Sequence, residues 1–321
     1  MLKISRNTLP YLQWALLAIV VSSIVYHFYI HRYELANLRN VGVPSLFLLG
    51  AFIVVFNYLS AIRFSIACQL VGAKMSSLES FALSIVGTMV NFLLPGQAGA
   101  FLKAAYLKQL YGVPYSKVPA ILLGNIVTTI FIGGLLMLCA NFFALFRNTN
   151  ISPILWLISA LAFGSILLFW IHLPVHKLPV HSKRLQELLE LLLSAWKSFS
   201  ENRTKLAYIC ILQTFLYLVS GACILIAFRS LGITIGITFA VILMAATSLL
   251  SLVNLVPGNL GINEAIIAYF STLFGINFTY GLTAAVIMRA SSFLLIVFFT
   301  PMCWGFLSQK KGFRALQRLG Q

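Results

Sequence analysis

The sequence predicts an all-α polytopic membrane protein, with about six full-spanning helices and two re-entrant helical hairpins arranged as inverted repeats. Of its 321 residues, 60% are hydrophobic and only 9% are charged, a composition that a soluble domain with a polar surface does not have. Apolar runs of about 20 residues or more predict spanning helices rather than barrel strands. Two similar Pro-Gly interruptions predict the hairpins.

Eight apolar runs follow one another along the sequence and are separated by short polar connections. Their approximate ranges are 11–30, 45–72, 78–95, 118–146, 152–173, 205–231, 237–257 and 280–307. Lys3 and Arg6 precede the first run and no small-residue cleavage site follows it, so we expect an uncleaved first helix rather than a signal peptide. Since the runs and their connections fill the sequence, we expect no soluble catalytic domain.

Two of these runs end at Pro-Gly and continue into a second, shorter apolar segment. The stretches are NFLLPGQAGAFLKAAYLKQLYGV and NLVPGNLGINEAIIAYFSTLFGI. A Pro-Gly pair most often only ends a helix, but paired interruptions in two halves of a membrane protein indicate a transporter's binding site. We therefore predict hairpins over 78–111 and 237–275. The matching tip positions are Asn91, Pro95, Gly96 and Gly99 in the first, and Asn254, Pro257, Gly258 and Gly261 in the second.

The distribution of Lys and Arg supports hairpins whose two ends lie on the same side of the membrane. With a cytoplasmic N-terminus, most basic residues then face the cytoplasm; those that face outward are Arg32, Arg39, Arg147 and Arg229. If 78–95 and 237–257 crossed fully, the cytoplasmic excess would disappear, contrary to the positive-inside rule. The hairpins therefore open to opposite sides, and residues 1–148 and 149–321 form inverted halves with both termini in the cytoplasm.

Arg63, Glu264 and Arg289 fall at membrane depth in this topology. Each charged side chain costs roughly 2.5 to 3.5 kcal/mol at the bilayer centre on insertion scales, unless it is paired or hydrated. We therefore expect these side chains to face the interior. Two interpretations stay open: a structural ion pair between Glu264 and Arg289, or a polar slot in which Arg289 and Arg63 bind the phosphate of a lipid headgroup.

The motifs LPGQAGAFLKAAYL and VPGNLGINEAIIAYF, each followed by Gly and a helix, resemble the lysylphosphatidylglycerol synthase transmembrane-region family, the flippase-like domain proteins. The likeness covers nearly the whole chain, and the second motif is the more specific. In the first motif Lys103 stands where the family usually has Arg, and Ala100 where it often has an acid; Asn125 lies near a common Arg position. The best-known members carry a C-terminal aminoacyl-transferase domain. Since no such domain precedes Gln321, the resemblance implies lipid translocation rather than lipid synthesis.

We expect a flippase-like translocator of a phospholipid or lipid-linked anionic substrate, integral to the plasma membrane (the inner membrane of a bacterium). Its predicted substrate-binding residues are Arg63, Lys103, Glu264 and Arg289. The alternative is a non-transporting accessory subunit or an enzyme of a cell-envelope lipid pathway. Catalysis is the weaker interpretation because the chain has no Asp and, of its six Glu, only Glu264 is expected at depth.

No cofactor, metal site or nucleic-acid partner is expected, and the sequence carries no signal for the oligomeric state. His172, His176 and His181 fit solvated loop histidines better than metal ligands. The formal charge of +16 follows from the topology, and the chain lacks a nucleic-acid motif, so anionic lipid is the expected partner. Leucine and aromatic residues at helical spacing predict an interfacial helix over 182–200.

Overall fold

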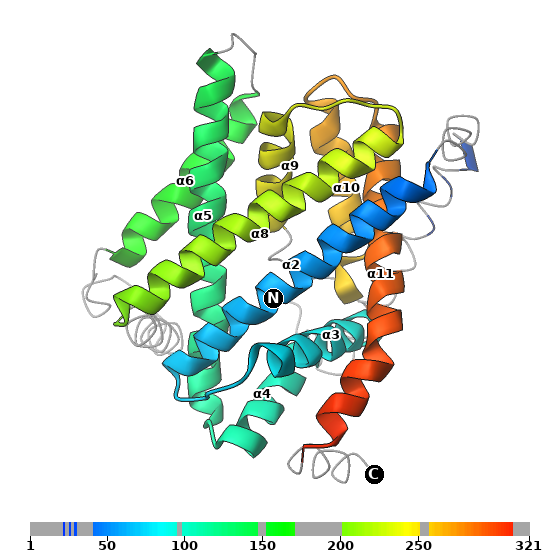
Figure 1. Cartoon of the computed structure of the whole chain (residues 1–321). Helices are drawn as coiled ribbons and strands as arrows, with labels where there is room; N and C mark the ends of the chain where they lie inside the picture. Colours follow the sequence, from blue (N-terminus) through cyan, green and yellow to red (C-terminus); the bar gives the residue numbers. More distant parts are fainter. Residues whose placement is uncertain are drawn as a thin grey trace, which may run out of the picture.

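The structure, a computed structural model, describes residues 22, 26, 29–30, 41–94, 98–146, 152–170, 201–250 and 257–310. Every regular element in these residues is helical, which confirms the predicted all-α class (Figure 1). The elements are α2 (Val43–Leu70), α3 (Ser77–Leu93), α4 (Ala98–Tyr111), the 3-10 turn η2 (Tyr115–Lys117), α5 (Val118–Phe146), α6 (Pro153–Trp170), α8 (Arg203–Ser230), α9 (Ile237–Leu250), the 3-10 turn η4 (Pro257–Asn259), α10 (Ile262–Thr272) and α11 (Phe278–Ser308).

Four described helices, α2, α5, α8 and α11, are long and apolar enough to cross a membrane: they have 28 to 31 residues, and an 18-residue window in each has a mean hydropathy of 2.1 to 2.2. At a rise of about 1.5 Å per residue they are roughly 42 to 46 Å long, which exceeds the hydrocarbon core of about 30 Å. The first predicted span, 11–30, lies almost wholly outside the described residues. The total of about six spanning helices therefore stays a prediction.

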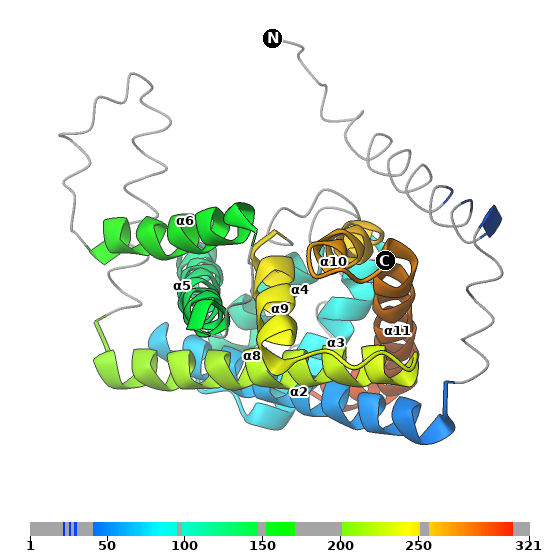
Figure 2. The same ribbon diagram turned by 90° about the horizontal axis from the view of Figure 1, so that it is seen from above.

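Helices α2 and α8 lie side by side across one face of the molecule and run in opposite directions (Figures 1 and 2). The start of α8 meets the end of α2, where Lys205 Nζ lies 3.5 Å from the carbonyl oxygen of Gln69. The steeper helices α5 and α11 cross this pair. Helix α5 packs against α9, and α11 packs against α3. Each of these long helices therefore packs against the first helix of the predicted hairpin in the other half of the sequence.

Helices α3 and α4 form an antiparallel pair, here called the first hairpin. At its tip the Asn91 Oδ1 atom accepts a hydrogen bond of 2.7 Å from Gly99 N, which satisfies one of the N–H groups left free at the start of α4. A side chain at Gly99 would overlap the carbonyl oxygen of Gly87, so the two backbones touch. At the other end, here called the open end, Tyr106 and Tyr111 of α4 donate hydrogen bonds to Glu79 of α3.

Helix α9, the turn η4 and helix α10 form the second hairpin. Phe239 near the start of α9 contacts Phe274 just after α10, with 4.4 Å between their ring centroids, so these helices also run antiparallel. Gly258 and Gly261 have φ of 59° and 81°, a region in which glycine avoids the strain that a side chain adds. The chain turns there, and α10 begins at Ile262.

Two buried apolar clusters hold the hairpins in place. The first includes Phe64, Leu83 and Leu307 around the first hairpin, and the second includes Phe228, Ile242 and Phe270 around the second. Pro95, Gly96, Asn254, the predicted interfacial helix 182–200, the 148/149 boundary and both termini lie outside the described residues. The membrane depth of the hairpins and the inverted relation of the halves stay predictions.

Candidate functional site

Arg289 and Glu264 form an ion pair at the tip of the second hairpin. Arg289 Nε lies 3.5 Å from Glu264 Oε1, and their side chains are 22% and 5% exposed. The Glu264 Oε2 atom accepts a hydrogen bond of 2.7 Å from Gly261 N, which caps the start of α10. Arg289 Nη2 also donates to the carbonyl oxygen of Gly258. The pair therefore fixes the turn at the start of α10 to α11.

Phe92 joins the tips of the two hairpins. It lies at the end of α3, and its ring centroid is 4.9 Å from the guanidinium carbon of Arg289, within the range of a cation–π contact. A Cβ atom on Gly258 would lie 2.9 Å from Phe92 Cδ1, so no side chain fits between the second tip and this ring. Phe293 of α11 packs edge-on against Phe92 with 5.5 Å between the ring centroids.

Arg63 of α2 projects toward the middle of α5. Its Nη1 atom donates a hydrogen bond of 3.3 Å to Thr129 Oγ1, and the Tyr217 hydroxyl of α8 donates one of 2.9 Å to the carbonyl oxygen of Thr129. The Arg63 Nε atom is buried and has no hydrogen-bond partner. Among the described residues, no carboxylate pairs with Arg63, so this guanidinium retains donors for a further acceptor.

Lys103 of α4 lies within electrostatic range of Arg63 and likewise has no carboxylate partner in the described parts of the chain. Its Nζ atom lies over the ring of Phe64, 4.8 Å from the centroid. A Cβ atom on Gly87 would lie 3.1 Å from Lys103 Cε, so the absence of a side chain there leaves space for the lysine. Two partly buried cations thus lie within electrostatic range of each other without a described counter-charge, an arrangement that favours an anionic ligand.

Two further uncharged polar side chains lie on the helices that carry Thr129 and Tyr217. Asn125 lies one turn before Thr129, and Gln213 lies one turn before Tyr217. Asn125 Oδ1 and Gln213 Oε1 are buried without a hydrogen-bond partner, and unpartnered buried polar atoms are rare in folded proteins. The polar spacing of four residues on α5 and α8 was a sequence signal for this cluster that our sequence analysis did not use.

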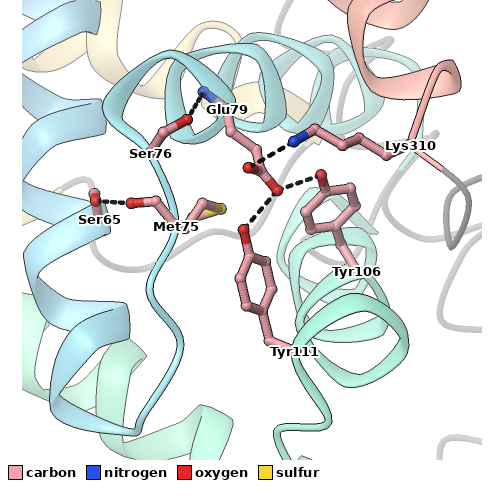
Figure 3. A network of polar contacts seen from close by, with 7 residues as sticks. All are labelled: Ser65, Met75, Ser76, Glu79, Tyr106, Tyr111 and Lys310. Atoms are coloured by element: carbon pink, nitrogen blue, oxygen red, sulfur yellow. Dashed lines mark hydrogen bonds and ion pairs between the residues drawn. The ribbon is translucent and has the colours of Figure 1, made fainter.

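Glu79 was also missed. The sequence analysis singled out only Glu264 among the glutamates, yet both are buried in the protein: Glu79 is 3% exposed and Glu264 4%. The Tyr106 and Tyr111 hydroxyls donate hydrogen bonds of 2.7 and 2.8 Å to Glu79 Oε1, and Lys310 Nζ lies 3.5 Å from Oε2 (Figure 3). This network ties the open end of the first hairpin to the end of α11.

The structure therefore places the predicted substrate-binding residues in two groups rather than one. Glu264 and Arg289 form the tip group, and Arg63 and Lys103 form the cation group. Within the residues described, no hydrogen bond or ion pair connects the two groups. Helix α3 connects them physically, since its Gly87 contacts Lys103 and its Phe92 contacts Arg289.

Long apolar helices around a buried polar interior define an integral membrane protein of the helical class. The chain belongs to the family described as the lysylphosphatidylglycerol synthase TM region, whose model matches residues 12–299. This match confirms the resemblance drawn from the two Pro-Gly motifs. No curated protein and no solved structure matches the chain significantly.

Proposed function

We propose that this protein moves a phospholipid or a lipid-linked anionic substrate across the bilayer. The observation that carries the proposal is the pair of partly buried cations, Arg63 and Lys103, for which the described residues supply no carboxylate. Charges withdrawn from water are costly unless they are paired, so stability alone does not account for two partly buried cations within electrostatic range of each other. A phosphate headgroup would supply the missing charge, while its acyl chains remain in the bilayer.

The architecture supports movement of such a substrate. The two hairpin tips meet at Phe92 and Gly258, and the exchanged packing of α5 with α9 and of α11 with α3 is what an inverted repeat would give. In inverted-repeat transporters, broken helices meet near the membrane midplane and bind substrate there. We place the protein in the plasma membrane, the inner membrane of a bacterium, with both termini in the cytoplasm and the first hairpin open to that side.

Reconstitution of the purified chain alone tests the proposal. The rate at which a fluorescent anionic phospholipid crosses the bilayer of proteoliposomes would be measured for the wild type and for an Arg63→Gln, Lys103→Gln double variant. The matched control is an Arg203→Gln, Lys117→Gln double variant, because Arg203 and Lys117 are exposed. We expect transport by the wild type and the control, and little transport by the first double variant.

A melting curve separates loss of function from loss of fold. Because Arg63 and Lys103 lack a described counter-charge, their replacement by glutamine should leave the melting temperature unchanged or raise it. Unimpaired transport by a folded Arg63→Gln, Lys103→Gln variant would contradict this site. If the purified wild-type protein, reconstituted without any other protein, moved no lipid, this result would instead support the accessory-subunit alternative.

A further inference from the structure

Helix α11 is held by an ion pair at each of two places. Arg289, in its first half, pairs with Glu264, and Lys310, just past its end, pairs with Glu79. Both pairs measure 3.5 Å. Their surroundings differ in a way that determines which of them can separate.

Separation at Arg289 would leave a charge in the interior. Glu264 has one further partner, the N–H of Gly261. Arg289 donates to Gly258 at the tip of the second hairpin and lies over the ring of Phe92, which packs against Phe293. Removal of one partner of a buried ion pair is strongly unfavourable because the other charge remains unpaired. The contact at Arg289 therefore fixes α11 to the second hairpin.

Separation at Lys310 would leave neither charge stranded. The Lys310 side chain is 44% exposed, so its ammonium group can return to water. Glu79 keeps the two tyrosine hydroxyls, at 2.7 and 2.8 Å, and lies in the first turn of α3 after the Ser76 N-cap, where the helix dipole favours a negative charge. Both tyrosines belong to the first hairpin, so the carboxylate would stay with the hairpin when α11 moves (Figure 3).

We propose that the Glu79–Lys310 ion pair is a latch, which holds the open end of the first hairpin against α11 and releases when that end opens to substrate. The inference rests on the proposed transport function. In this arrangement α11 pivots about Arg289, and its far end moves. Release would also loosen Leu307, which is fully buried in the same apolar cluster as Tyr106 and Cys68.

Cys68 provides a native reporter for release of the latch. It is fully buried, and it lies within electrostatic range of Lys103 and Tyr111. The control reporter is Cys223, which is buried in the cluster around the second hairpin. Full-length proteins that retain only Cys68 or only Cys223 would be treated with a water-soluble maleimide, and the rate of thiol modification would be measured by mass spectrometry.

Lys310→Gln should raise the modification rate of Cys68 about two- to fivefold, the effect expected from losing a partly exposed ion pair. Glu79→Gln should do the same, because its amide oxygen still accepts from both tyrosines but carries no charge. The matched control, Lys117→Gln, should change nothing. One molar salt should accelerate modification of Cys68 in the wild type by screening the pair, and should have no such effect in Lys310→Gln.

Two results would overturn the latch. One is an unchanged Cys68 rate in Lys310→Gln and Glu79→Gln; the other is an equal rise at Cys68 and Cys223, which would indicate general loosening. Thiol modification does not require transport, so the two proposals fail separately. A selective rise in the Cys68 modification rate without lipid transport would support the latch and refute the transport function. Lipid transport without a rise in the Cys68 modification rate would support the transport function and refute the latch.

Discussion

The guanidinium group of Arg289 lies over the ring of Phe92, with 4.9 Å between the guanidinium carbon and the ring centroid. Arg289 belongs to α11 and Phe92 to the first hairpin, while the same guanidinium donates to Gly258 of the second hairpin. One side chain thus contacts both hairpin tips. Any movement of one hairpin relative to the other has to rearrange these contacts, so the tip group links α11 to both hairpins.

Glu264→Gln should lower stability because it removes the charge that Arg289 pairs with. The amide oxygen of glutamine can still cap α10, so the change isolates the ion pair. Arg289 is 22% exposed and keeps the Gly258 carbonyl, so we expect a loss of about 1 to 3 kcal/mol, below that for a fully buried pair. The measurement is a melting curve in detergent, with Glu201→Gln at an exposed position as the control.

The second arm of this experiment is a double-mutant cycle with Arg289→Gln. If the ion pair is structural, the Glu264→Gln, Arg289→Gln double variant should be more stable than the sum of the two single losses predicts. Strict additivity would refute a direct interaction. Unchanged lipid transport by a stable double variant would remove the tip group from substrate binding.

Gly99→Ala should disrupt the first hairpin. The added methyl group would overlap the carbonyl oxygen of Gly87, and both atoms belong to closely packed helices that cannot move apart without breaking the Asn91 contact with Gly99. Overpacking of this kind costs about 1 to 3 kcal/mol or more. Gly305→Ala is the matched control because a methyl group there meets nothing within 4 Å. Equal melting temperatures for the two variants would contradict the close approach of α3 and α4.

The helices could be predicted from the sequence because their lengths are set by apolar runs. The run at 118–146 has the bounds of α5, and the run at 205–231 differs from α8 by two residues at its start and one at its end. The Pro-Gly signals identified where α3 ends and where η4 begins. The run at 237–257 begins at the first residue of α9, which is described as far as Leu250.

The partners of Glu79 could not be predicted because sequence distance hides them. Ser76 and Glu79 have the spacing of a helix N-cap signal, and that signal is satisfied locally. Tyr106 and Tyr111 are 27 and 32 residues away, and Lys310 lies just past the end of α11, the last helix described. Only the packing of α3, α4 and α11 brings them to one carboxylate. The separation of Arg63 from Arg289 was hidden for the same reason.

Topology can be tested with single cysteines at exposed helix ends. Lys74→Cys and Asn202→Cys lie at the meeting point of α2 and α8 and should react only with a reagent on the cytoplasmic side. Asn277→Cys, before α11, should react only from outside; Thr279 is unsuitable because it is buried. The measurement is labelling of intact cells by an impermeant maleimide. Labelling of all three positions from one side would refute the inverted halves.

Lys103→Arg should keep transport, whereas Lys103→Gln should reduce it. Arginine carries the same charge, and the family resemblance places arginine at this position. Loss of one charge-assisted contact with a phosphate should slow transport of an anionic lipid about tenfold to a hundredfold. The transport rates of phosphatidylglycerol and phosphatidylcholine analogues would be compared in the same proteoliposomes, with Lys117→Gln as the control.

If Lys103 acts on the headgroup's net charge, Lys103→Gln should slow transport of the anionic lipid more than transport of the zwitterionic one. Equal slowing of both lipids would show that Lys103 supports the fold or the path rather than recognition of the anion.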